Sequence, residues 1–323
     1  MAKIHIIIIS PASAKANNGN WQTASRWAHF LRAHYRVTVM TQWDGTPCDL
    51  MIALHARRSA VSIAEFAAAH PALPLLLVLT GTDLYRDIRH DADAQRSLQL
   101  ATRLIVLQQA GLDELKPDFR NKAQVIHQSA RQLTPLDRGA ASRYFDVVMI
   151  GHLREEKDPL TFMRAARLLH LRDLPGLRLL HVGAALDPAL GEAARTEQAA
   201  NPRYRWLGNM AHGTTRQRLK RSHLMVITSI MEGGANVIIE AVTSGVPVLA
   251  SDISGNRGML GDDYTGYFPV GDGAALAALI ERVLADPAFY ARLQQQCTAR
   301  APLFSPQQER ASLLQLVDNL VKQ

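Results

Sequence analysis

Residues 222–258 limit the possible folds of this chain more than any other stretch. The short apolar run Leu224–Thr228 predicts a buried parallel strand. A pair of glycines follows it, and Ala235–Thr243 then predicts a helix with an apolar stripe. A further glycine ends that helix, and Val248–Ser251 predicts a second buried strand. Strand, glycine turn, helix and strand in this order indicate a parallel α/β sheet.

The glycine turn inside this stretch predicts an anion site. Gly233 and Gly234 let a ligand approach the backbone closely, and the free N–H groups of the helix start favour a phosphate. Glu232 and Glu240 flank this site, eight positions apart. Carboxylates repel phosphate but accept hydrogen bonds from hydroxyls, so a sugar and a ribose on either side of a diphosphate would fit. The alternative is an ordinary strand–helix unit whose glycines only form a tight turn.

The same stretch resembles the Glu-x7-Glu segment of the retaining glycosyltransferases with the GT-B fold. The match lies in Glu232-Gly233-Gly234, Glu240-Ala241 and Gly245-Val246-Pro247-Val248. The resemblance implies an α/β protein of two doubly wound, Rossmann-like parallel-sheet domains that face each other across a cleft. It also implies a nucleotide-sugar donor in the C-terminal half.

The length of 323 residues predicts two domains. The polar segment Leu133–Ser142, which contains a proline and a glycine, is interpreted as the linker. We therefore expect an acceptor domain over residues 1–140 and a donor domain over 141–304. By resemblance, a C-terminal helix over 305–323 crosses back to the first domain.

Composition and charge limit the classes of partner that this chain is expected to bind. The net charge of +7 fits anionic small substrates, whereas the absence of Lys/Arg runs argues against nucleic acid. Only two cysteines, Cys48 and Cys297, are present, and no apolar stretch reaches ~18 residues. With no secretory signal, we expect a cytoplasmic protein without membrane insertion. No Cys/His spacing indicates a metal site.

A second candidate site follows the predicted strand Phe145–Ile150. Arg154 and Lys157 lie three residues apart in the loop after it, so both can neutralise a diphosphate. The alternative is a helix start whose charges pair locally. GT-B glycosyltransferases carry these cations at the leaving diphosphate, which implies that neither metal nor cofactor is needed. By resemblance, the donor-binding set is Gly151, Arg154, Lys157, Asn209, Met210, Glu232, Gly233, Gly234, Ala235, Asn236 and Glu240. The predicted catalytic residues are Glu232, Arg154, Lys157 and His55.

Loops after three predicted strands of the first half are rich in hydrogen-bond donors. The predicted strand Ile4–Ile9 leads into a loop that contains Asn-Asn-Gly-Asn. The predicted strand Leu50–Leu54 is followed by His55–Arg58, and Leu73–Thr80 is followed by Gly-Thr-Asp-Leu-Tyr-Arg. Amide and guanidinium donors at strand ends suit a compact oxyanion. The alternatives are a turn-rich loop, a solvated arginine pair and a core histidine. The predicted acceptor-binding set is Lys15, Asn18, Gly19, Asn20, Arg57, Arg58, Thr80, Asp83 and Arg86.

Three of these first-half segments together resemble the selenosugar synthases of selenoneine biosynthesis. They are residues 10–24, Leu54–Ser59 and Leu79–Tyr85. The resemblance implies UDP-N-acetylglucosamine or UDP-glucose as donor and selenophosphate as acceptor. A histidine commonly precedes the glycine of this last segment in GT-B enzymes, and Thr80 replaces it here.

Other functions stay open from the residues alone. One is a GT-B glycosyltransferase with a sugar or lipid acceptor, and another is an enzyme like UDP-N-acetylglucosamine epimerase. A third is a protein that binds nucleotides or nucleic acid without catalysis.

Overall fold

A computed structural model describes residues 3–12, 19–136 and 143–322. The chain divides into two compact units. The first unit holds residues 1–129, 232–234 and 305–323, and the second holds 130–231 and 235–304.

The first unit contains, within the described residues, a six-stranded parallel sheet in the order β2-β1-β3-β4-β5-β6. The order reverses between β1 and β3, since the chain leaves β1 toward β2 on one side and continues from β3 on the other. The strands are β1 His5–Ile9, β2 Arg36–Met40, β3 Leu50–Leu54, β4 Leu75–Leu79, β5 Arg103–Val106 and β6 Ala123–Val125. The helices are α1 Gly19–Leu31, α2 Ala60–Ala69, α3 Ile88–His90, α4 Ala92–Leu100, α5 Pro117–Arg120 and α13 Pro306–Val321.

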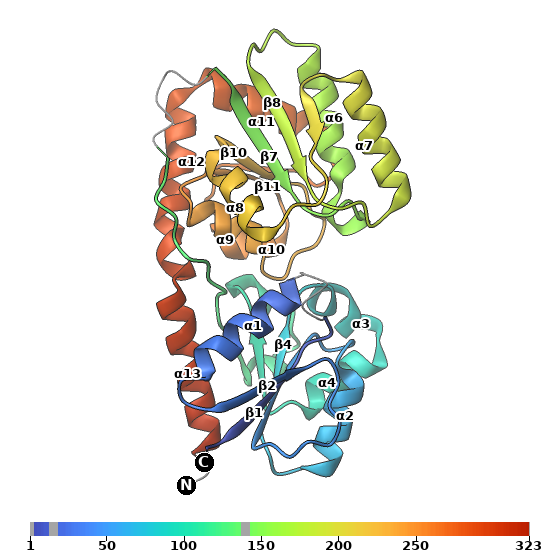
Figure 1. The fold of residues 1–323 in the computed structure, drawn as a ribbon, viewed down its shortest axis with the longest axis vertical. Helices are drawn as coiled ribbons and strands as arrows, with labels where there is room; N and C mark the ends of the chain where they lie inside the picture. The colour runs from blue at the N-terminus through green and yellow to red at the C-terminus, as the bar shows by residue number, and fades with distance from the viewer. Residues whose placement is uncertain (1–2, 13–18, 137–142, 323) are drawn as a thin grey trace. The chain divides into compact units, whose positions relative to one another are not determined.

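Both faces of this sheet are covered, which explains why β1, β3 and β4 read as continuous apolar runs. Side chains alternate between the faces. Ile6 and Ile8 pack in a core with α1 and α13, whereas Ile7 and Ile9 pack in a core with α2 and α4. Figure 1 shows α13 running beside α1.

A buried carboxylate fastens α13 to this unit. Glu309 accepts from Arg26 through Nε at 2.8 Å and Nη2 at 3.1 Å, and from Trp27 Nε1 at 2.7 Å. The backbone N–H of Ser129 donates to it at 2.9 Å, and the Ser129 hydroxyl at 2.5 Å. Glu309 is only 1 % exposed, so these donors compensate for its lost hydration.

The second unit contains, among the described residues, a parallel sheet of six strands in the order β12-β11-β10-β7-β8-β9. Here the order reverses between β7 and β10. The strands are β7 Phe145–Ile150, β8 Leu177–Val182, β9 Tyr204–Trp206, β10 Leu224–Ile227, β11 Val248–Ser251 and β12 Tyr267–Phe268. The helices are α6 Pro159–His170, α7 Pro188–Ala200, α8 His212–Arg221, α9 Asn236–Val242, α10 Ser254–Leu260, α11 Gly273–Ala285 and α12 Pro287–Arg300. Figure 1 shows α6 and α7 at one side of the sheet and α8 and α9 at the other.

The predicted fold class of two doubly wound parallel sheets is confirmed. Strands β3, β7 and β11 have the predicted bounds. The sequence did not lead us to expect helices α3, α4, α5, α10 and α12. Most of the predicted linker, residues 137–142, lies outside the described residues. No helix in the described part of the chain has the length and apolarity to span a membrane.

Candidate functional site

Each sheet has one point at which the strand order reverses, and in open α/β sheets ligands bind at the carboxyl ends of the strands there. In the second unit these are the ends of β7 and β10. The loop after β7 carries the predicted cations Arg154 and Lys157. In the first unit the reversal lies between β1 and β3, and His55 is the first residue after β3.

The loop after β7 is built to hold a fixed shape. Glu155–Lys157 forms a 3₁₀ turn, and Asp158 then adopts a left-handed conformation with φ 41°. The Asp158 carboxylate accepts from Thr161 N at 3.2 Å, and Pro159 occupies the first position of α6. The stem of Lys157 lies against Gly151, where an added Cβ would be 3.6 Å from Lys157 Cδ.

Two hydrogen bonds join this loop to the end of β10. The hydroxyl of Thr228 donates to the carbonyl of Lys157 at 2.8 Å, and Ile230 N–H donates to the carbonyl of Glu156 at 3.0 Å. The two loops at the reversal point therefore form one connected backbone surface.

Arg154 has an unmatched buried donor. Its Nε is buried without a hydrogen-bond partner among the described residues, and Glu156 Oε2 is 3.9 Å away. A buried N–H of this kind normally has a partner, so its position suits an anionic ligand. The pKa of neighbouring His152 is lowered by burial and then by the charges of Arg154 and Lys157. Both cations therefore act on the same side chain at the start of the loop.

Two buried side chains, His181 and Tyr204, hold the backbone at Gly151, where the loop after β7 begins. His181 Nε2 lies 3.2 Å from the carbonyl oxygen of Gly151, and His181 Nδ1 lies 2.9 Å from Tyr204 Oη. A carbonyl only accepts, so Nε2 carries the proton and Nδ1 accepts from the Tyr204 hydroxyl. Burial lowers the pKa of His181 to about 4, which keeps it neutral. A Cβ on Gly183 would lie 1.9 Å from the Gly151 oxygen, so this contact requires glycine.

The predicted base-binding residues follow β9. Gly208 takes a left-handed conformation with φ 69°, and its carbonyl accepts from Gly183 N–H at 2.8 Å. Asn209 is exposed and Met210 is half-buried. Both directly follow Gly208 and so lie in the loop that is bonded to Gly183.

Glu240 lies in α9 and is 8 % exposed. His212 Nε2, at the start of α8, lies 2.6 Å from Glu240 Oε1. Arg216, one turn further along α8, is a cation near this carboxylate: burial lowers its pKa and Glu240 raises it. His212 and Arg216 could not be predicted from the sequence, because only the packing of α8 on α9 brings them to Glu240.

Residues 232–234 group with the first unit. A Cβ on Gly233 would lie 2.5 Å from the carbonyl oxygen of Thr80, and one on Gly234 would lie 2.8 Å from Leu107 Cβ. Neither glycine therefore leaves room for a side chain. Glu232 is 9 % exposed, and Ala235 and Asn236 begin the α9 segment of the second unit.

In the first unit, His55 has the left-handed φ of 73° and is buried. Its Nδ1 accepts from Arg58 N–H at 3.3 Å, so its Nε2 carries the proton and donates to the Thr82 hydroxyl at 3.0 Å. Burial lowers the pKa of His55, against the opposing charge of Asp83, so the ring is neutral. Both ring nitrogens therefore have hydrogen-bond partners, one in the loop after β3 and one in the loop after β4.

Asp83 organises the backbone of this loop. Its fully buried carboxylate accepts from the N–H groups of Ala56 at 3.0 Å, Thr80 at 2.9 Å and Gly81 at 2.8 Å. We had predicted Asp83 as part of the acceptor site. The structure shows that its oxygens face backbone donors, while Thr80 is half-buried beside it.

Asp87 forms ion pairs with two of the predicted arginines, Arg57 and Arg86. The π-helical turn Asp83–Asp87 places its carboxylate 2.9 Å from Arg57 Nε and 3.1 Å from Arg86 Nε, with His55 Nε2 at 3.9 Å. Arg57 and Arg86 side chains are 42 % and 48 % exposed, so their terminal NH₂ groups can reach solvent. Arg58, also exposed, follows Arg57 directly. The sequence did not indicate Asp87.

The remaining predicted acceptor residues precede or begin α1. Gly19 and Asn20 form its first turn, and the Gly19 carbonyl accepts from the Thr23 hydroxyl at 2.8 Å. Lys15 and Asn18 lie outside the described residues.

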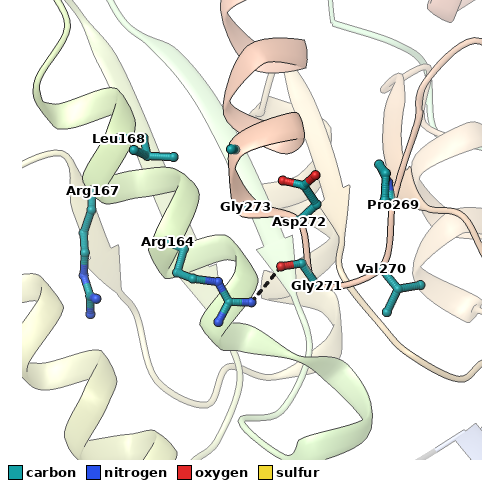
Figure 2. Close-up of a pocket in the computed structure, with 9 residues that line it drawn as sticks. Arg164, Arg167, Leu168, Pro269, Val270, Gly271, Asp272 and Gly273 are labelled. Carbon is teal, nitrogen blue, oxygen red and sulfur yellow. Dashed lines mark hydrogen bonds between the residues drawn. The ribbon is translucent and has the colours of Figure 1, made fainter.

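A separate hollow of about 680 Å³ lies between α6 and the loop before α11 (Figure 2). It is lined by Arg164, Arg167 and the segment 269–274. Both arginines have protein partners: Arg164 donates to the Gly271 carbonyl at 3.0 Å, and Arg167 pairs with Glu197. The hollow holds none of the predicted site residues, so we do not assign the donor to it. No group of three or more His, Cys, Asp or Glu side chains suited to a metal occurs in the described residues.

Comparison with known proteins decides the family. The model of the family "Glycosyl transferases group 1" matches residues 136–301, just over half of the chain. The chain belongs to this family. The matched region includes the cation loop and Glu240, whereas His55, Arg57 and Arg86 lie outside it.

Two curated relatives are each 29 % identical over a limited segment. One is Glycosyltransferase 1 domain-containing protein 1 of Xenopus tropicalis, over 119 residues, which are 37 % of this chain and 34 % of that protein. The other is the UDP-Gal:alpha-D-GlcNAc-diphosphoundecaprenol alpha-1,3-galactosyltransferase of Escherichia coli, over 131 residues, 40 % of this chain and 33 % of that protein. The matched segments span about a third of each relative.

Solved structures share the fold over nearly the whole chain. Sucrose-phosphate synthase from Thermosynechococcus elongatus has a TM-score of 0.78 at 18 % identity and covers 98 % of this chain and 99 % of its own. Anabaena HepE in complex with UDP has a TM-score of 0.74 at 18 % identity, with coverage of 99 % and 100 %. The pneumococcal O-GlcNAc transferase GtfA, in complex with UDP and GlcNAc, has a TM-score of 0.69 at 18 % identity and covers 85 % of this chain and 57 % of its own.

Proposed function

We propose that this protein is a glycosyltransferase that takes a sugar from a UDP-sugar. The observation that carries the proposal is the cation loop at the reversal point of the second sheet, where the Nε of Arg154 is buried without a hydrogen-bond partner among the described residues. A diphosphate supplies an acceptor oxygen for this N–H group. HepE and GtfA share the fold and were solved with UDP, which supports UDP as the nucleotide.

Within this proposal the donor residues divide their roles. Arg154 and Lys157 bind the diphosphate and offset the charge that develops on it as the sugar leaves. Glu240 accepts from the ribose hydroxyls, and Glu232 acts at the sugar. The backbone of the segments Gly233–Asn236 and Asn209–Met210 contacts the phosphates and the base, respectively. No metal or other cofactor takes part.

We propose selenophosphate as the acceptor, with UDP-N-acetylglucosamine or UDP-glucose as donor. Arg57 and Arg58 follow β3 at the reversal point of the first sheet, and Arg86, after β4, shares Asp87 with Arg57. Guanidinium forks suit a compact trianion better than an uncharged sugar. Selenium attacks the anomeric carbon and forms the C–Se bond, while the C–O bond to UDP breaks and its electron pair leaves with UDP. Because selenophosphate is already ionised, this step needs no general base.

We predict that transfer does not require a metal ion, because two cations already face the diphosphate. Activity in an excess of chelator should stay within about twofold of that in magnesium, measured as UDP release. Loss of activity in chelator that magnesium or manganese restores would contradict this prediction.

The acceptor assignment is tested by the double variant Arg57→Ala, Arg58→Ala. We expect turnover with selenophosphate to fall at least ~100-fold, because two charge-assisted contacts of about 1.5–3 kcal/mol each are lost. UDP affinity, measured by calorimetry, should stay unchanged. Arg96→Ala is the matched control, since Arg96 is an exposed arginine of α4 in the same unit.

A melting temperature near that of the parent establishes that the double variant is folded. Unchanged selenophosphate turnover in the folded double variant would remove the acceptor site. An acceptor without charge, such as a sugar or a lipid, would then fit the family better.

A further inference from the structure

We propose that His212 is a positioning residue that orients the Glu240 carboxylate toward the ribose of the nucleotide. This inference rests on the proposed function, because it presumes that UDP binds in the second unit. His212 is absent from the donor-binding, catalytic and acceptor-binding sets predicted from the sequence.

The first step is the geometry of the pair. Glu240 is nearly buried in α9, whereas the His212 side chain is 48 % exposed at the start of α8. The distance of 2.6 Å between His212 Nε2 and Glu240 Oε1 is that of a short, charge-assisted hydrogen bond. Since a carboxylate only accepts, Nε2 is the protonated nitrogen.

The second step is what this bond leaves available. An ionised carboxylate has about four lone-pair positions on its two oxygens. The bond to His212 occupies one position on Oε1 and fixes the plane of the group. Oε2 and the rest of Oε1 are then oriented to accept from two neighbouring hydroxyls, as the 2′ and 3′ hydroxyls of a ribose are.

The third step is the support behind the pair. Arg216 lies four residues after His212 on the same helix and places a positive charge near Glu240. Its Nη2 donates to the carbonyl of Arg131 at 2.8 Å, which fixes the guanidinium. The hydrogen bond from His212 and the charge of Arg216 offset the cost of burying Glu240, so α8 holds this carboxylate ready before the nucleotide arrives.

An ordinary surface ion pair would contribute little and would not depend on the ligand. If His212 positions Glu240, replacing His212 should lower affinity only for ligands that carry the ribose hydroxyls. This difference separates the two interpretations.

The experiment compares UDP with 2′,3′-dideoxy-UDP by calorimetry on the parent, His212→Ala, His212→Gln and Glu240→Gln. In His212→Ala we expect UDP affinity to fall about 10-fold, the order expected for one lost charge-assisted bond, while affinity for the dideoxy ligand stays the same. His212→Gln, which keeps an N–H donor, should recover most of the loss. His170→Ala, an exposed histidine of α6, is the control and should bind both ligands as the parent does.

Equal losses for both ligands in His212→Ala, or no loss for UDP, would overturn the inference. If Glu240→Gln in that case lowers affinity for UDP but not for the dideoxy ligand, the proposed donor site stands without His212. A parent protein that binds neither ligand would overturn the proposed function and this inference together.

Discussion

Replacing both Arg154 and Lys157 by alanine is expected to lower UDP affinity by roughly 10²–10⁴-fold. Each side chain contributes a hydrogen bond to a charged group, worth about 1.5–3 kcal/mol, and ~1.4 kcal/mol corresponds to tenfold. The buried Nε of Arg154, unpartnered within the described residues, adds to this, because the ligand satisfies a donor that the protein does not. Calorimetric titration of UDP measures the effect.

The control for this pair is Arg195→Ala, which removes an exposed arginine that pairs with Glu192 on α7. It should change UDP affinity by less than about twofold, because exposed ion pairs contribute ~0–1 kcal/mol. If the double variant bound UDP as tightly as the parent, the donor would have to lie elsewhere than at the β7 loop.

The second large effect concerns stability. Glu309→Ala is expected to lower the free energy of unfolding of the first unit by about 3–5 kcal/mol, the range for removing one partner of a buried charge pair. The substitution leaves the donors of Arg26, Trp27 and Ser129 without their shared acceptor. Three of the four tryptophans, Trp21, Trp27 and Trp43, belong to this unit, so denaturant unfolding followed by tryptophan fluorescence reports on it.

Glu281→Ala provides the comparison, because Glu281 pairs with Arg172 at 3.2 Å on the exposed side of α11. Its loss should cost at most about 1 kcal/mol. A Glu309 variant as mildly affected as this one would show that α13 is held by its apolar contacts alone.

The strands could be predicted because their apolar runs are local signals. Leu50–Leu54 and Val248–Ser251 have the predicted bounds, since strands covered on both faces carry little besides apolar residues. Helix α12 was missed although Phe289, Leu293 and Cys297 recur every four residues and are buried. Its otherwise polar sequence concealed that stripe.

Candidate site residues could be chosen from the sequence where they follow a strand closely, as Arg154 follows β7 and Arg57 follows β3. Sequence cannot distinguish a carboxylate that faces a ligand from one that accepts from backbone, and Asp83, predicted for the acceptor site, accepts from backbone N–H groups. Contacts between side chains on separate elements could not be predicted either. Asp87 joins two arginines through a π-helical turn, and His212 meets Glu240 through helix packing.

The most direct test of the proposed reaction is a screen of UDP-sugars against phosphate, thiophosphate and selenophosphate, read by mass spectrometry. We predict UDP release together with a product that contains both the sugar and selenium, without added metal. We also predict that Arg57→Ala, Arg58→Ala fails to make this product. Release of UDP only with a sugar or lipid acceptor, or conversion of the donor to an epimer, would contradict these predictions.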